Sequence, residues 1–167
     1  MLSITRLVRP EILVSIAVFL LIWSKYCNRG HIYKASKRVE KIIDINKLRS
    51  LDWRQFEEIL ADYFTMRGYH VELGVGDAAD GGIDILLRKD GKKIIVQAKH
   101  YRNQVGVAIV REMYGAMIHH NADEVLICTT SFFTQHAKEF AKDKPIQLIH
   151  GHKIVNMFNT ALKERGK

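Results

Sequence analysis

Three polar residues with complementary chemistry occur on two neighbouring predicted strands. A predicted strand over residues 83–88 carries Asp84, and the next, over residues 93–99, carries Gln97 and Lys99. An Asp-Gly pair between the strands is a typical hairpin turn, so we expect the strands to pair. Because alternate residues of a strand share a face, Gln97 and Lys99 point the same way, with Asp84 beside them.

These groups suit metal-dependent chemistry on a phosphate ester. The carboxylate of Asp84, the amide oxygen of Gln97 and the backbone carbonyl of Ala98 are hard oxygen ligands of the kind that Mg²⁺ prefers. The ammonium of Lys99 can orient or deprotonate a water molecule and offset charge that develops on a phosphate. An ordinary cross-strand ion pair between Asp84 and Lys99 is the alternative, and the residues alone favour it.

The surrounding sequence resembles the Mrr-type restriction endonuclease domain. This domain is a branch of the PD-(D/E)xK nuclease superfamily in which glutamine replaces the usual acidic residue of the second strand. The resemblance runs from about Leu51 to Phe158. In chain order, the matching motifs are PheGlu at 56–57, GlyTyr at 68–69, AspGlyGlyIleAsp at 80–84, GlnAlaLys at 97–99, ThrThr at 129–130, PheThr at 133–134 and Ala137. The short motifs are weak singly, and their order makes the resemblance specific.

The resemblance implies a role for each matching residue. Asp84 would be the metal-binding carboxylate, Gln97 the ligand on the second strand and Lys99 the catalytic lysine. The backbone carbonyl of Ala98 would join the metal ligands. Glu57, on the first predicted helix, would be the acid that completes the site. With the resemblance, this nuclease site is favoured over the simple ion pair.

Helical spacing separates Glu57 from its neighbour Glu58 without reference to any family. Glu57 lies four residues after Trp53 and three before Leu60, at the edge of the apolar face of the predicted helix. Glu58 falls on the face that carries charged residues. We therefore expect Glu57 to approach the site, although a solvated helix acid is nearly as good an interpretation.

Three further residues are weaker candidates. Asp80 matches an acidic residue that recurs in the family, or it only forms a turn. His100 and Arg102 follow the lysine and are candidate contacts to DNA phosphates, whereas a solvated loop is an equally good interpretation. The sequence departs from the family at His150-Gly151, where relatives commonly have AspGly, outside the expected metal site.

The elements that must position these residues alternate along the chain. They are a helix over 52–67, strands over 69–73, 83–88 and 93–99, a helix over 105–119, a strand over 124–129, a helix over 134–142, a strand over 146–149 and a helix over 153–163. This order predicts an α/β fold, an α/β/α sandwich around a mixed central sheet. The resemblance implies that the sandwich is restriction-endonuclease-like.

An uncharged run from Ile12 to Ser24 precedes this domain. It is shorter than the roughly 20 residues of a spanning helix. It is nonetheless apolar on all sides except Ser15, so we expect residues 1–27 to form a single transmembrane helix. More basic residues follow the run than precede it, which predicts a single-pass inner-membrane protein whose nuclease domain is cytoplasmic. A helix in the plane of the membrane interface is the competing interpretation.

We expect residues 28–47 to form a basic juxtamembrane linker helix and residues 48–167 to form the nuclease domain. Ile32, Ala35 and Val39 recur at helical spacing among lysines and arginines. This pattern is typical of an amphipathic helix that lies on anionic lipid or docks on the domain. An ordinary solvated linker helix is nearly as good an interpretation.

Net charge says little about the domain itself. The chain of 167 residues has a formal charge of +8, but residues 1–50 hold 10 basic and 3 acidic side chains, which leaves 16 and 15 for residues 51–167. The basic surplus is therefore no argument that the domain binds DNA. An apolar fraction of 47% excludes a disordered chain, and two cysteines exclude a disulfide framework.

The sequence and the resemblance together predict a membrane-anchored, Mg²⁺-dependent DNA endonuclease that acts in restriction or defence. Its expected partners are DNA, the membrane and a second copy in a homodimer. A nuclease that resolves branched DNA is an alternative within the fold. A non-catalytic, nuclease-like DNA-binding or scaffold module at the membrane is the alternative from another class, and a purely structural membrane protein is a third.

Overall fold

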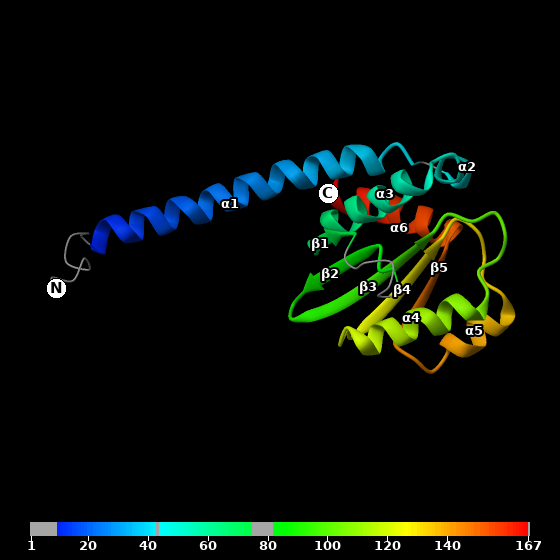
Figure 1. Ribbon diagram of the computed structural model, residues 1–167. Helices are drawn as coiled ribbons and strands as arrows, with labels where there is room; N and C mark the ends of the chain where they lie inside the picture. Colours follow the sequence, from blue (N-terminus) through cyan, green and yellow to red (C-terminus); the bar gives the residue numbers. More distant parts are fainter. Residues whose placement is uncertain (1–9, 43, 75–81, 167) are drawn as a thin grey trace.

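The sheet at the centre of the protein has five strands in the order β1-β2-β3-β4-β5 (Figure 1). The computed structural model describes residues 10–42, 44–74 and 82–166. The strands are β1 (His70–Leu73), β2 (Ile85–Lys89), β3 (Lys92–Lys99), β4 (Glu124–Thr129) and β5 (Ile146–His150). The pairs β1–β2 and β2–β3 are antiparallel, and β3–β4 and β4–β5 are parallel. The predicted mixed sheet is confirmed.

Helices cover both faces of this sheet, as an α/β/α sandwich requires (Figure 1). One face carries α3 (Trp53–Met66) and α6 (Gly151–Arg165), and the other carries α4 (Val107–His119) and α5 (Gln135–Ala141). The short helix α2 (Ile45–Arg49) contacts α6. Side chains of β3 serve both cores, because Val96 and Ala98 pack toward α3 and α6 while Ile95 packs toward α4.

Local sequence signals account for the ends of the elements near the site. Asp52 accepts a hydrogen bond from the Gln55 backbone nitrogen at 2.8 Å, and the Gln55 side chain accepts one from the Asp52 nitrogen at 3.0 Å. This capping box begins α3. The turn between β2 and β3 has positive φ at Asp90 (50°) and Gly91 (77°), the geometry that tight hairpin turns require.

The N-terminal helix is one continuous element rather than an anchor followed by a separate linker. Helix α1 runs from Pro10 to Val39, so the predicted boundary between residues 27 and 28 falls inside it. Its C-terminal part packs along α3, with Ala35 and Val39 buried. Arg38 in α1 forms an ion pair with the buried Asp62 of α3. This end of α1 therefore belongs to the core of the domain.

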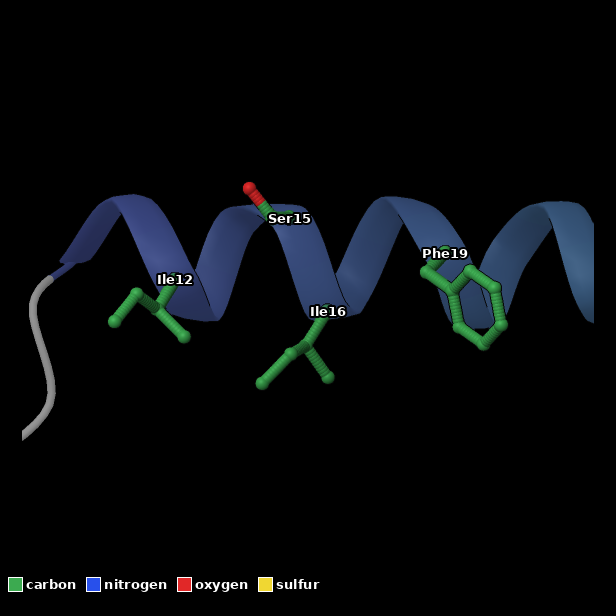
Figure 2. Close-up of a pocket in the computed structure, with 4 residues that line it drawn as sticks. All are labelled: Ile12, Ser15, Ile16 and Phe19. Atoms are coloured by element: carbon green, nitrogen blue, oxygen red, sulfur yellow. The ribbon is translucent and has the colours of Figure 1, made fainter.

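The other end of α1 extends away from the sheet (Figure 1). Ile12, Ile16 and Phe19 are exposed there, and they line a shallow apolar hollow together with Ser15. Figure 2 shows Ile12 and Ile16 pointing to one side of the helix and Ser15 to the opposite side.

The predicted transmembrane helix is wrong. Within the part of the chain that the structure describes, no helix combines the length and the apolar character needed to cross a bilayer. The physical reason is that the uncharged run ends at Ser24, and α1 continues through Lys25 and Arg29. A stretch of about 20 residues therefore includes charged groups. The predicted inner-membrane location, the single-pass topology and the membrane partner depended on that span and are corrected with it.

Candidate functional site

Asp84 lies where β2 and β3 separate. The last residue pair between these strands is Ile85 with Val96. Beyond it, the backbone nitrogen of Ala98 donates a hydrogen bond of 2.6 Å to Oδ2 of Asp84. The side chain of Asp84 thus accepts from the β3 backbone where continued strand pairing would supply a main-chain carbonyl. This contact fixes the half-buried carboxylate at the carboxyl end of β3.

Gln97 holds the same carboxylate from the side. Its side chain is buried, with 3% of the residue exposed, and its Nε2 donates a second hydrogen bond to Oδ2 of Asp84. The predicted proximity of Asp84 and Gln97 is therefore present. Because the amide nitrogen makes this contact, the amide oxygen of Gln97 is the atom left for any ligand.

Lys99 ends β3, next to these two residues, and is partly exposed. No ion pair joins Lys99 to an acidic side chain in the described ranges, so the simple Asp84–Lys99 ion pair is not formed. Its Nζ lies 6.0 Å from the centroid of the Tyr101 ring. The positive charge of the ammonium is close enough to Asp84 and Glu57 to act on both carboxyl groups. It lowers the pKa of each and so opposes burial, which raises it.

Glu57 approaches the site from α3. It is half-buried whereas Glu58 is exposed, so the predicted difference between the two faces is confirmed. Burial raises the pKa of the Glu57 carboxyl, and the negative charge of Asp84 raises it further. Trp53, expected on the apolar face, is instead 57% exposed and lies beside the Arg54 guanidinium, 4.8 Å from its ring centroid.

Asp84 is also held in an environment that disfavours its charge. Burial raises the pKa of its carboxyl above the usual range, against the opposing effects of the Ala98 backbone hydrogen bond, the Lys99 charge and the Gln97 hydrogen bond. The site thus combines two carboxyl groups of raised pKa with one ammonium. Such a set can bind a divalent cation or a water molecule that is to be activated.

Of the weaker sequence candidates, His100 is half-buried and Arg102 is exposed. The His100 ring packs edge-on against Phe56, with the ring centroids 5.7 Å apart, and its Nε2 is buried with no hydrogen-bond partner. Asp80 lies outside the described residues. At the departure from the family motif, His150 is half-buried and Gly151 begins α6.

Sequence reasoning named His100 and Arg102 as candidates but missed the polar cleft of about 750 Å³ that they help to line. Arg49 reaches it from α2, and Thr130 and Ser131 reach it from the loop after β4. These residues are distant in sequence from the catalytic motif. The available signal was the place of Thr130 and Ser131 after the carboxyl end of the parallel strand β4, where α/β sheets commonly bind ligands.

Comparison with known protein families gives a match over most of this domain. The sequence model of a family described as restriction endonuclease (Mrr_cat) matches residues 48–158. EcoKMrr, a type IV methyl-directed restriction enzyme of Escherichia coli (strain K12), is 33% identical over 131 residues, which cover 74% of this chain and 41% of that protein. The uncharacterized protein y4cE of Sinorhizobium fredii (strain NBRC 101917 / NGR234) is 31% identical over 128 residues, 71% of this chain and 32% of that protein.

Solved structures share the fold at low sequence identity. The protein of unknown function AF1548 superposes with a TM-score of 0.54 at 18% identity, over 66% of this chain and 65% of that one. The DNA modification-dependent restriction endonuclease AspBHI gives a TM-score of 0.53 at 17% identity, over 81% of this chain and 38% of its own. The chain spans less than half the length of both relatives found by sequence. The match of the family model to residues 48–158 shows that the chain belongs to the Mrr-type restriction endonuclease family.

Proposed function

We propose that this protein is a Mg²⁺-dependent endonuclease that hydrolyses phosphodiester bonds in DNA as part of a restriction system. The observation that carries the proposal is the placement of Asp84. Two donors from β3, the Ala98 nitrogen and the Gln97 amide, hold its carboxylate beside Lys99 and Glu57. Membership of the restriction endonuclease family and the name of the relative EcoKMrr support it.

The donor set fits Mg²⁺ better than a transition metal. In the described ranges, no three His, Cys, Asp or Glu side chains cluster in a way that holds a metal. The oxygens available at the site come from Asp84, Glu57, the Gln97 amide and the Ala98 carbonyl, and hard oxygens with few protein carboxylates are typical of Mg²⁺ sites. Burial and the negative charge of Asp84 raise the pKa of Glu57, and the positive charge of a bound divalent cation would lower it.

Each residue then has a defined task. Asp84 and Glu57 would hold the cation, with the amide oxygen of Gln97 and the Ala98 carbonyl as further ligands. The cation would polarise the scissile phosphate and lower the pKa of a bound water. Lys99, free of any ion pair in the described ranges, would orient the attacking water and offset the charge that develops on the phosphate.

The deciding experiment is cleavage of supercoiled plasmid by the full chain, with methylated and unmethylated DNA, in Mg²⁺ and in EDTA. We expect nicked or linear product only with Mg²⁺. Asp84→Ala and Lys99→Ala should each lower the rate by about 10²-fold or more, because each removes a group that acts on the reacting phosphate. Lys92→Ala is the matched control, since this exposed lysine begins the same strand.

Circular dichroism and thermal unfolding would establish that the variants are folded. Wild-type cleavage rates in either site variant would contradict the assignment of the site. DNA binding without cleavage by the folded wild-type chain would instead favour a non-catalytic, nuclease-like DNA-binding module.

A further inference from the structure

The polar cleft is lined in part by the three residues that directly follow the proposed catalytic lysine in the chain. It has a volume of about 750 Å³, within the range of ligand sites. Its polar lining comes from α2, from the loop after β3 and from the loop after β4: Arg49, His100, Tyr101, Arg102, Thr130 and Ser131. Lys99 ends β3, and its backbone carbonyl accepts a hydrogen bond from Oγ1 of Thr129 at 2.8 Å. Tyr101, whose ring centroid lies 6.0 Å from Nζ of Lys99, lines the cleft and so connects it to the site.

The cleft is built to receive negative charge. Two of its side chains are arginines and none is a carboxylate. Neither Arg49 nor Arg102 forms an ion pair with any acidic side chain in the described part of the chain. Planar guanidinium groups bind phosphate oxygens through paired hydrogen bonds. Two arginines that share one cleft, neither in an ion pair within the described residues, thus favour a phosphate as the occupant.

Hydrogen bonds between its walls hold the cleft in shape before any ligand arrives. Nε of Arg49 donates to the Thr130 carbonyl at 3.3 Å, which leaves the terminal nitrogens of the guanidinium for a ligand. Thr130 Oγ1 donates to the Tyr101 carbonyl at 3.1 Å, and Ser131 Oγ donates to the Arg102 carbonyl at 3.2 Å. Preorganised walls reduce the entropic cost of binding.

We propose that this cleft binds the nucleotide of the DNA strand next to the bond that is cut, with Arg49 and Arg102 contacting its phosphate. The proposal rests on the proposed nuclease function. A DNA strand carries one phosphate about every 3.4 Å of helix axis. Because Tyr101 lines the cleft and its ring centroid lies 6.0 Å from Nζ of Lys99, a strand with one phosphate at Lys99 can place a neighbouring phosphate in the cleft. The volume exceeds that of a phosphate alone and admits the attached sugar.

The test measures binding separately from cleavage. Fluorescence anisotropy would follow a labelled 20-base-pair DNA duplex bound by the full chain in EDTA, over a series of KCl concentrations. Arg49→Ala and Arg102→Ala should each weaken binding by about tenfold and reduce the slope of log K against log salt by about 1, because each removes one phosphate contact. Arg111→Ala is the matched control, an exposed arginine on α4.

Arg49→Lys is the control that separates the loss of a phosphate contact from a folding defect. It keeps the positive charge but loses the planar group bound to Thr130, so we expect the wild-type salt slope to be retained.

Wild-type affinity and slope in Arg49→Ala and Arg102→Ala would overturn the proposal, as would a wild-type chain that does not bind the duplex in low salt. Tight binding of a free deoxynucleotide with unchanged duplex binding in Arg49→Ala would overturn it in favour of a small-molecule site. Failure of the nuclease function would show separately, as a wild-type chain that binds DNA but leaves plasmid intact in Mg²⁺.

Discussion

At the residue scale, the site concentrates two carboxyl groups whose negative charge the fold disfavours. Burial is the largest cause of the raised pKa at both Glu57 and Asp84. When the folded state raises the pKa of an acid, it binds the proton more tightly than the unfolded chain does, so stability falls as pH rises through the ordinary range of that acid. The apo site is therefore a small source of instability at neutral pH, which a bound cation would relieve.

Glu57→Gln tests whether the buried negative charge of Glu57 lowers the stability of the fold at neutral pH. In EDTA at pH 7 we expect the variant to unfold at a temperature about 1–2 °C above wild type, because it removes the disfavoured charge. The difference should vanish below the ordinary pKa range of glutamate, where both chains are neutral at this position. Glu58→Gln, at an exposed position on the same helix, is the control and should unfold with wild type. A lower unfolding temperature for Glu57→Gln would contradict the prediction.

At the scale of elements, the C-terminal end of α1 and the turn after it belong to the domain that the site depends on. Val39 is fully buried and Ile42 is 3% exposed, both in the core cluster under α3 and α6. The ion pair of Arg38 with Asp62 and a 2.8 Å hydrogen bond from Arg165 to the Ile32 carbonyl tie α1 to α3 and α6. Helix α3, which carries Glu57, is thus braced from outside by residues that precede the family match.

Ile42→Ala measures how much the packing of this segment contributes to the free energy of unfolding. We expect a loss of about 2–5 kcal/mol in the free energy of unfolding, because the change removes a buried branched side chain and leaves a cavity. Ile16→Ala changes the same residue type on the exposed part of α1 and should stay within about 0.5 kcal/mol of wild type. Urea unfolding followed by circular dichroism gives both values. Equal losses in the two variants would show that the end of α1 does not pack as described.

At the scale of the whole molecule, the folding unit is larger than the family match. The match begins at residue 48, but Ala35, Val39 and Ile42, which precede it, are buried in the core. The part of α1 that extends from the domain precedes them (Figure 1). The folding unit that carries the nuclease site therefore includes the second half of α1. A chain that begins at residue 48, where the family match begins, lacks part of the hydrophobic core.

Two shortened chains separate these possibilities. A chain of residues 30–167 keeps the buried residues that the structure describes in α1 and should unfold within a few degrees of the full chain. A chain of residues 48–167 loses Ala35, Val39 and Ile42 and should unfold more than about 10 °C lower, or fail to fold. Scanning calorimetry distinguishes them. A stable, cooperative transition in the shorter chain, at the temperature of the longer one, would contradict the larger folding unit.

The sequence by itself determined the features that depend on neighbours along the chain. From residue 52 onward, periodicity predicted the helices and strands to within about two residues at each end, whereas the expected boundaries of the N-terminal helices differ from those of α1 and α2. The capping box of Asp52 and Gln55 and the turn at Asp90 and Gly91 are short-range interactions, and both are present. The approach of Asp84 to Gln97 was predictable too, because a hairpin fixes the register of the two strands it joins.

The tertiary structure alone decided the features that depend on residues far apart in the chain. The ion pair between Arg38 and the buried Asp62 joins residues that are 24 positions apart in the chain, and no local pattern predicts such a partner. An apolar run at Ile12–Ser24 has the same composition whether a bilayer, a protein or water surrounds it, and so the transmembrane prediction failed. The cleft exists because Arg49 meets Thr130, 81 residues further along the chain. Such contacts depend on how the sheet brings its strand ends together, which one-dimensional spacing does not encode.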